Sequence, residues 1–106
     1  MLDVHWSHSE KQIARRVFES SLERELEGVI QEFKARVTAI SSPADMWDLE
    51  RFLSDKRREI DAKYDYRYSQ LYSVFGRLLS EGRIDELSLQ GLADAKLEII
   101  RRIASL

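Results

Sequence analysis

Residues that break helices are almost absent from this chain. Among 106 residues there is one proline, Pro43, and there are four glycines, Gly28, Gly76, Gly82 and Gly91. Because proline and glycine interrupt regular elements most strongly, such scarcity favours a few long segments. No stretch alternates apolar and polar residues with the β-branched enrichment that is typical of a strand. We therefore predict an all-α chain.

Two serines mark the start of the first helix. In the stretch SHSE, Ser7 can cap the helix and Glu10 follows three residues later, which is the spacing of a capping box. Apolar residues then recur at helical intervals, and from Leu26 onward they alternate in steps of four and three, the spacing of a helix-packing seam. We predict a long helix over about residues 8–40, in which Gly28 permits the close approach of another backbone.

The clearest boundary in the chain lies at residues 41–45. Ser42 is suited to the N-cap, Pro43 to the first helical position and Asp45 to the position three residues after the cap. No comparable stop follows before Gly82, so we predict a second helix over about residues 43–80. It would be about 57 Å long at about 1.5 Å per residue. Helices over about residues 84–105 are expected to form a small C-terminal head.

A helix of that length has consequences for assembly. A compact chain of this size is about 33 Å across, so an apolar stripe on the protruding part would lie in water unless another chain covered it. We predict that residues 1–106 form a single helical domain, with two long antiparallel helices and a head, in an elongated homodimer. The predicted dimer-interface residues are Leu26, Phe33, Met46, Leu49, Leu53 and Ile60.

Charged residues interrupt the packing rows of the second helix. Glu50, Arg57 and Arg67 occupy positions in rows that are otherwise apolar. Such residues are usually solvated at the edge of an interface, with packed stems and charged groups in water. The alternative is that they pair across the dimer seam and set its register.

Composition argues against several classes of function. The chain has 19 acidic and 17 basic side chains, a net charge of −2, so its surface as a whole does not favour nucleic acid or anionic lipid. It has no cysteine, no glycine-rich phosphate loop and no Ser/His/Asp set, and we expect no metal at the nearby Asp3, His5, His8 and Glu10. It shows neither an apolar run of about 18 residues nor a signal peptide. We predict a non-enzymatic cytoplasmic protein without cofactor or metal.

The sequence instead offers a binding surface on the second helix. Seven residues share one helical face: Trp47, Glu50, Arg51, Ser54, Arg57, Arg58 and Asp61. A tryptophan among arginines and acids is the composition of an interface hot spot. The same pattern also fits a half-buried tryptophan at the dimer seam, surrounded by a solvated charged face. The residues alone favour neither interpretation.

The stretches MWDLERFLSDKRREIDAKYDYRYSQL, VFGRLLSEG and LADAKLEIIRRIASL are similar to the fluorescence recovery protein family of cyanobacteria, and the similarity runs through most of the chain from Trp6. The resemblance implies an all-α homodimer without a cofactor. It implies binding to the photoactivated orange carotenoid protein, largely through that protein's C-terminal domain. The family speeds the return of this partner to its orange form and ends quenching at the phycobilisome, on the cytoplasmic side of the thylakoid.

The resemblance also suggests functional positions. Trp47 and Arg57 match the family's functionally important tryptophan and arginine, whereas Glu50 and Arg51 stand where members usually have histidine and aspartate. The predicted partner-binding residues are Trp47, Glu50, Arg51, Arg57 and Phe75. Because the local charge is reversed, an alternative is a dimeric adaptor of the same fold that acts on a different protein partner.

Overall fold

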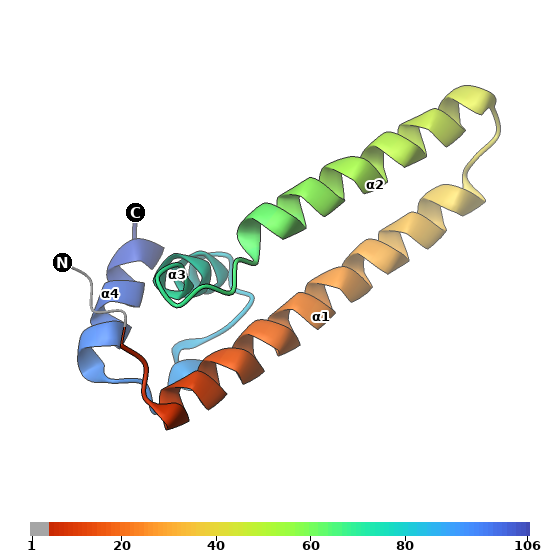
Figure 1. The fold of residues 1–106 in the computed structure, drawn as a ribbon. Coiled ribbons are helices and arrows are strands. Elements are labelled where there is room, and N and C mark those ends of the chain that lie inside the picture. Colours follow the sequence, from red (N-terminus) through yellow and green to blue (C-terminus); the bar gives the residue numbers. More distant parts are fainter. Residues whose placement is uncertain (1–4) are drawn as a thin grey trace. The chain divides into compact units, whose positions relative to one another are not determined.

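The computed structural model describes residues 5–106, and within this range every regular element is helical. The elements in chain order are α1 (His8–Thr38), α2 (Pro43–Lys63), α3 (Leu71–Ser80), a short 3-10 helix (Glu86–Leu89) and α4 (Asp94–Ala104), as Figure 1 shows. The prediction of an all-α chain is confirmed for these residues.

The chain divides into two compact units. The head unit comprises Met1–Ser21, described from residue 5, together with Tyr64–Leu106. The hairpin unit is Leu22–Lys63. Helix α1 begins in the head unit and continues into the hairpin unit.

The second long helix ends earlier than the sequence predicts. We expected one helix over about residues 43–80, but α2 ends at Lys63 and α3 begins only at Leu71. The seven residues between them, 64–70, are not helical. The predicted helix was too long because residues 64–70 contain neither proline nor glycine, the residues that usually mark the end of a helix.

Tyrosines in the segment between α2 and α3 account for its conformation. The Phe18 ring meets the Tyr64 ring edge-on at a centroid distance of 5.4 Å and the Tyr66 ring at 4.8 Å. The guanidinium of Arg15 lies 4.4 Å from the centroid of the Tyr66 ring, and Tyr66 also contacts Tyr68. These contacts with Phe18 and Arg15 of α1 favour the non-helical conformation of residues 64–70 over a continuation of α2.

Aromatic and aliphatic side chains of α3 and α4 form the core of the head unit. The residues that are almost completely buried there include Leu71, Tyr72, Phe75, Leu78, Leu89 and Ile100. Gly76 allows α4 to approach α3, because a Cβ at this position would lie 2.5 Å from Cγ2 of Ile103. The Trp6 ring packs against Tyr72 at a centroid distance of 5.3 Å and is itself buried.

The predicted capping box at the start of α1 is confirmed, and its glutamate also contacts the start of α4. The Glu10 N–H donates to Ser7 Oγ at 3.2 Å, and the Ser7 N–H donates to Glu10 Oε1 at 3.0 Å. The other oxygen of Glu10 accepts from the backbone N–H of Ala93 at 2.9 Å, and Lys96 Nζ lies 3.3 Å from Glu10 Oε1. One buried carboxylate thus joins the beginnings of α1 and α4.

These contacts change the acidity of Glu10. Burial by itself raises the pKa of the carboxyl group, but hydrogen bonds from the backbone N–H groups of Ser7 and Ala93, with the Lys96 ammonium, lower it from 4.5 to about 2. The folded state therefore holds Glu10 ionised at pH values where the unfolded chain has already bound a proton.

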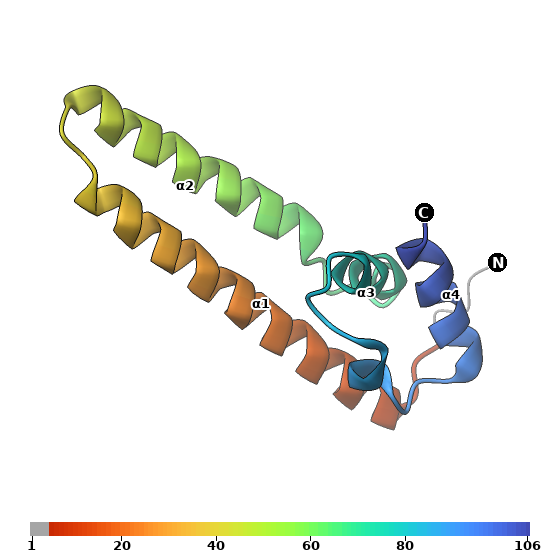
Figure 2. The ribbon, with the colours of Figure 1, turned by 180° about the vertical axis from the view of Figure 1, so that it is seen from behind.

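Within the hairpin unit, the C-terminal part of α1 and α2 run antiparallel, as Figures 1 and 2 show. The predicted start of α2 is confirmed, because the Asp45 N–H donates to Ser42 Oγ at 3.3 Å. Asp45 Oδ2 accepts from the backbone N–H groups of Ser41 at 3.0 Å and Ser42 at 3.2 Å. The turn between the helices is therefore closed by its own side chains.

We predict that Glu10→Gln lowers the free energy of unfolding at pH 7 and makes it less dependent on pH. Since the folded pKa of Glu10 lies below the unfolded value, its contribution is present above about pH 5 and is lost as the pH falls toward 2. The pKa difference corresponds to about 3 kcal/mol. Urea unfolding at pH 7 and pH 3 measures the effect.

The matched control is Glu19→Gln, which removes an exposed carboxylate of the same helix. This variant should keep the pH dependence of the unaltered chain. Equal pH dependence for the Glu10 and Glu19 variants would contradict the role assigned to Glu10.

Candidate protein-interaction site

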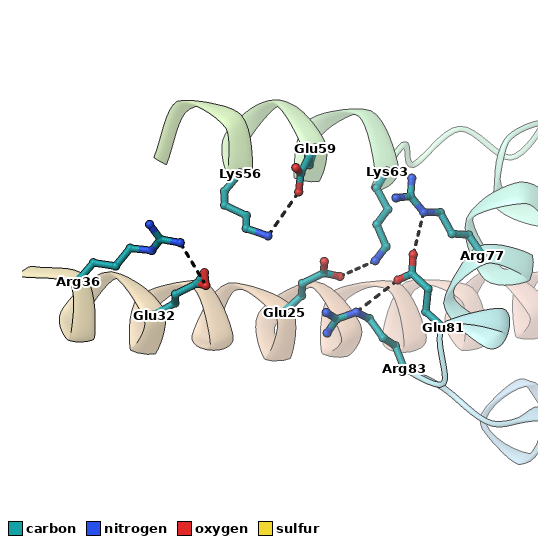
Figure 3. A network of polar contacts seen from close by, with 9 residues as sticks. All are labelled: Glu25, Glu32, Arg36, Lys56, Glu59, Lys63, Arg77, Glu81 and Arg83. Atoms are coloured by element: carbon teal, nitrogen blue, oxygen red, sulfur yellow. Dashed lines mark hydrogen bonds and ion pairs between the residues drawn. The ribbon is translucent and has the colours of Figure 1, made fainter. Parts of the chain in front are cut away.

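Charged side chains lie between the two helices of the hairpin unit. Figure 3 shows Lys63 of α2 reaching Glu25 of α1, with Nζ and Oε1 2.8 Å apart and both side chains largely buried. Farther along the hairpin, Arg36 of α1 lies over the ring of Phe52, 4.2 Å from its centroid. An ion pair and a cation–π contact thus join the two helices, beside the buried side chains of Leu49 and Ile60.

Several apolar side chains of the hairpin unit are turned outward. Six of them are between 37% and 49% exposed, and we call them the apolar strip: Leu26, Ile30, Val37, Ile40, Met46 and Leu53. A groove of about 350 Å³ lies in this region, lined by Leu22, Leu26, Val29, Leu53 and Ile60 together with Lys56, Arg57 and Asp61. Contiguous exposed apolar side chains on a protein surface mark interaction sites.

The predicted dimer-interface residues fall into two groups. Leu26, Met46 and Leu53 belong to the apolar strip, and Phe33 is partly exposed. Leu49 and Ile60 are instead buried in the hairpin unit, although Ile60 also lines the groove. Three members of the strip, Ile30, Val37 and Ile40, were absent from our predicted interface, although they belong to the apolar series in steps of four and three that begins at Leu26.

The predicted binding face of α2 is exposed along its whole length. Trp47 has 58% of its surface exposed, and all six other members of the face are exposed as well. The interpretation of Trp47 as half-buried does not hold for the single chain.

The arginines of this face are paired with acids of the same helix. Arg51 Nη1 lies 3.4 Å from Asp48 Oδ1, Arg57 Nε lies 3.9 Å from Asp61 Oδ2, and Arg58 pairs with Asp55. Such exposed pairs contribute little to stability, typically less than about 1 kcal/mol each. The guanidinium groups can therefore exchange their helical partners for acceptors on another protein at small cost.

The sequence pointed to Asp55 as a member of a helix-surface ion pair, but we did not predict a role for Asp48. The spacing of three residues between Asp48 and Arg51 was the available signal, since such residues are neighbours on a helix. Glu50 differs from them: it forms no ion pair within the part of the chain that the structure describes.

Phe75 does not fit the partner-binding role that we predicted. The structure places it in the head core with no exposed surface, so it cannot touch a partner while the head unit stays folded. The spacing of Leu71, Phe75 and Leu78, at intervals of four and three, was a signal of this burial. We assign Phe75 to the core.

Glu10, one of the four residues considered for a metal site, has other partners in the structure. Glu10 is engaged by Ser7, Ala93 and Lys96, and Asp3 lies outside the described residues. Residues 5–106 contain no group of three or more histidine or acidic side chains that could hold a metal ion. In the same range, no helix combines the length and apolarity needed to cross a bilayer.

An outward-facing apolar strip beside an exposed tryptophan and arginine face defines a helical protein-interaction module. A family model described as photoprotection regulator fluorescence recovery protein matches residues 6–104. The chain is 41% identical over 104 residues to the fluorescence recovery protein of Synechocystis sp. PCC 6803, covering 98% of this chain and 95% of that protein. The chain therefore belongs to the fluorescence recovery protein family.

Solved structures of two relatives have the same fold. The fluorescence recovery protein of Fremyella diplosiphon is 39% identical, with a TM-score of 0.91. That of Synechocystis sp. PCC 6803 is 40% identical, with a TM-score of 0.90. Each comparison covers 96% of this chain and 100% of the other. By the family's description, the chain is a regulator of photoprotection.

Proposed function

We propose that the chain is a homodimeric regulator of the orange carotenoid protein. It binds the photoactivated form, mainly at that protein's C-terminal domain, and accelerates its return to the inactive orange form. Quenching at the phycobilisome thereby ends, which places the protein in the cytoplasm beside the thylakoid. The observation that carries the proposal is family membership over residues 6–104, with the tryptophan and arginine of the α2 face both exposed.

The proposed mechanism is binding without covalent chemistry. A protein accelerates the relaxation of another only when it binds the barrier state more tightly than it binds the starting form. The α2 face suits this task, because Arg51, Arg57 and Arg58 are exposed and their ion pairs within the helix are solvated. They are available to acceptors that the partner exposes part of the way through its return.

The homodimer is supported by the arrangement of the hairpin unit. Its apolar strip lies in water in a single chain, while charged side chains such as Lys63 and Glu25 fill part of the space between its helices. A second copy that presents the same strip removes both apolar surfaces from water, in an interface of the isologous type.

The charge of the α2 face supports a second candidate function. Glu50 is unpaired within the described residues, and Arg51 is paired with Asp48, where the resemblance leads us to expect histidine and aspartate. A fluorescence-recovery-protein-like dimeric adaptor that acts on a different protein partner would use the same face with this altered charge.

The test of the proposed function is direct. The purified chain is mixed with photoactivated orange carotenoid protein, and the recovery of the orange absorption is followed in the dark. Faster recovery that scales with the amount of chain supports the proposal. An unchanged recovery rate at saturating concentrations contradicts it and favours the adaptor.

We predict that Leu53→Glu converts the dimer to a monomer with reduced helicity. The change places two carboxylates in the seam and removes two leucines from it, at a cost of at least about 2 kcal/mol per dimer. Light scattering and circular dichroism measure the result. The control is Leu87→Glu in the head unit, where Leu87 is 74% exposed, and this variant should remain dimeric. If the unaltered chain is a monomer at micromolar concentration, the proposed homodimer is contradicted.

We predict that Arg57→Leu abolishes the acceleration of recovery while the dimer survives. Truncation of a true hot spot costs about 2 kcal/mol or more, which is about thirtyfold in affinity. The matched control is Arg102→Leu, because Arg102 is also exposed and pairs with an acid of its own helix, Glu98, at 3.6 Å. If Arg57→Leu dissociates the dimer instead, Arg57 stabilises the seam and is not a recognition residue.

We predict that the double change Glu50→His with Arg51→Asp raises activity on the orange carotenoid protein. The change gives the α2 face the charge expected of the family, so recovery in the dark should become faster than with the unaltered chain. Equal recovery rates would show that the charge reversal has no bearing on this partner.

A further inference from the structure

Five aromatic side chains of the head unit form a row of ring contacts. The Trp6 ring contacts the Tyr68 ring at a centroid distance of 6.1 Å, and the Tyr68 ring contacts that of Tyr66 at 5.8 Å. The Tyr66 ring meets that of Phe18 at 4.8 Å, and Phe18 meets Tyr64 at 5.4 Å. We call these residues the aromatic row. It runs from the residues before α1 to Tyr64, the first residue after α2.

Trp6 stands at the N-terminal end of the aromatic row. It precedes α1, which begins at His8, and only 3% of its surface is exposed. Its ring also contacts Tyr72 of α3 at a centroid distance of 5.3 Å, and Nζ of Lys96 lies 5.4 Å from its centroid. Its buried indole N–H has no hydrogen-bond partner within residues 5–106. Ring contacts, and no hydrogen bond of the side chain, therefore hold Trp6 in place.

Helix α1 presents matching groups to the tyrosines of the aromatic row. Nζ of Lys11 lies 5.2 Å from the centroid of the Tyr68 ring, and the Arg15 guanidinium lies 4.4 Å from that of the Tyr66 ring. Lys11, Arg15 and Phe18 follow one another at intervals of four and three residues, so they share one face of the helix. The segment between α2 and α3 therefore contacts this one face of α1.

The burial of Tyr66 has an energetic cost that its neighbours must offset. Its hydroxyl group is buried but has no hydrogen-bond partner within residues 5–106. Burial of such a group without a partner disfavours the packed conformation, whereas each aromatic contact favours it modestly. Burial also raises the pKa of the Tyr66 phenol, which the Arg15 guanidinium partly opposes. The packed conformation therefore depends on support from both sides of Tyr66, from Phe18 and from Tyr68.

We propose that Trp6 is a positioning residue for residues 64–70: through Tyr68 it holds Tyr66 against α1, and it thereby helps to end α2 at Lys63. The inference goes beyond the proposed function and depends on neither the homodimer nor the partner protein. Residues 64–70 form a two-state element, packed on α1 while Trp6 occupies its site and released when Trp6 leaves it. The N-terminal end of the head unit is thus a latch for a segment that lies far away in the sequence.

Nitration by tetranitromethane reports on this segment, whatever conformation the released residues take. The reagent attacks exposed phenolate groups, so release of Tyr66 speeds its reaction both by exposing the hydroxyl group and by lowering its raised pKa. Mass spectrometry separates Tyr66 from the other three tyrosines. Trp6→Leu keeps an apolar side chain but removes the ring, and it should speed the nitration of Tyr66 about tenfold. Trp6→Phe keeps a ring and loses only an N–H without a partner, so its rate should stay within about threefold of that of the unaltered chain.

Leu89→Ala is the matched control for a general loss of stability. Leu89 is completely buried in the head unit but lies outside the aromatic row. Circular dichroism in urea should show that this variant is less stable, while under folding conditions its Tyr66 reacts within about twofold of the unaltered rate. A control that speeds nitration as much as Trp6→Leu does would overturn the inference, because any weakening of the head core would then free Tyr66. Equal rates for Trp6→Leu and Trp6→Phe, whether both slow or both fast, would overturn it as well.

The route through Tyr68 has its own test. Tyr68→Leu removes the link between Trp6 and Tyr66 but leaves Trp6 on Tyr72, so this variant also covers the case in which Trp6→Leu does not fold. It should speed the nitration of Tyr66 about tenfold as well. In the double variant the second change should add less than about twofold, since two changes on one path of contacts do not act independently. Effects that multiply, or no effect of Tyr68→Leu, would overturn the proposed coupling.

Discussion

A single buried carboxylate joins the two ends of the head unit. Glu10 completes the cap of α1 and accepts a hydrogen bond from Ala93 at the start of α4, with Lys96 beside it. Because a buried charge is tolerated only when its acceptor sites are occupied, this arrangement orients both helix ends at once. Trp6 and the core residues of α3 and α4 are buried in the same unit as Glu10.

Different interactions hold the hairpin unit together. Its helices are linked by contacts such as that between Lys63 and Glu25, and six of its apolar side chains are exposed on the apolar strip. In our proposal the surface used for the dimer and the surface used for the partner protein share helix α2. Arg57 lines the groove and also belongs to the face with Trp47, which is why separate readouts of dimer and partner are needed.

Membership of the fluorescence recovery protein family is consistent with this division of roles. The folded scaffold is shared with relatives at about 40% identity, as the solved structures show. At Glu50 and Arg51 the resemblance leads us to expect histidine and aspartate. Any difference in partner or in dimer register should therefore be sought on the α2 face before it is sought in the core.

Local interactions determined what the sequence alone could predict. The helix starts at Ser7 and Ser42 were predictable because each capping oxygen and the backbone N–H that donates to it lie within a few residues, and the exposed face of α2 followed from helical periodicity. The end of α2 at Lys63 was not predictable, because it depends on tyrosines that pack against Phe18, far away in the chain. Only tertiary structure decided it, since contacts between distant residues outweigh the local preference for a continuous helix. The bond from Ala93 to Glu10 and the burial of Phe75 were decided in the same way.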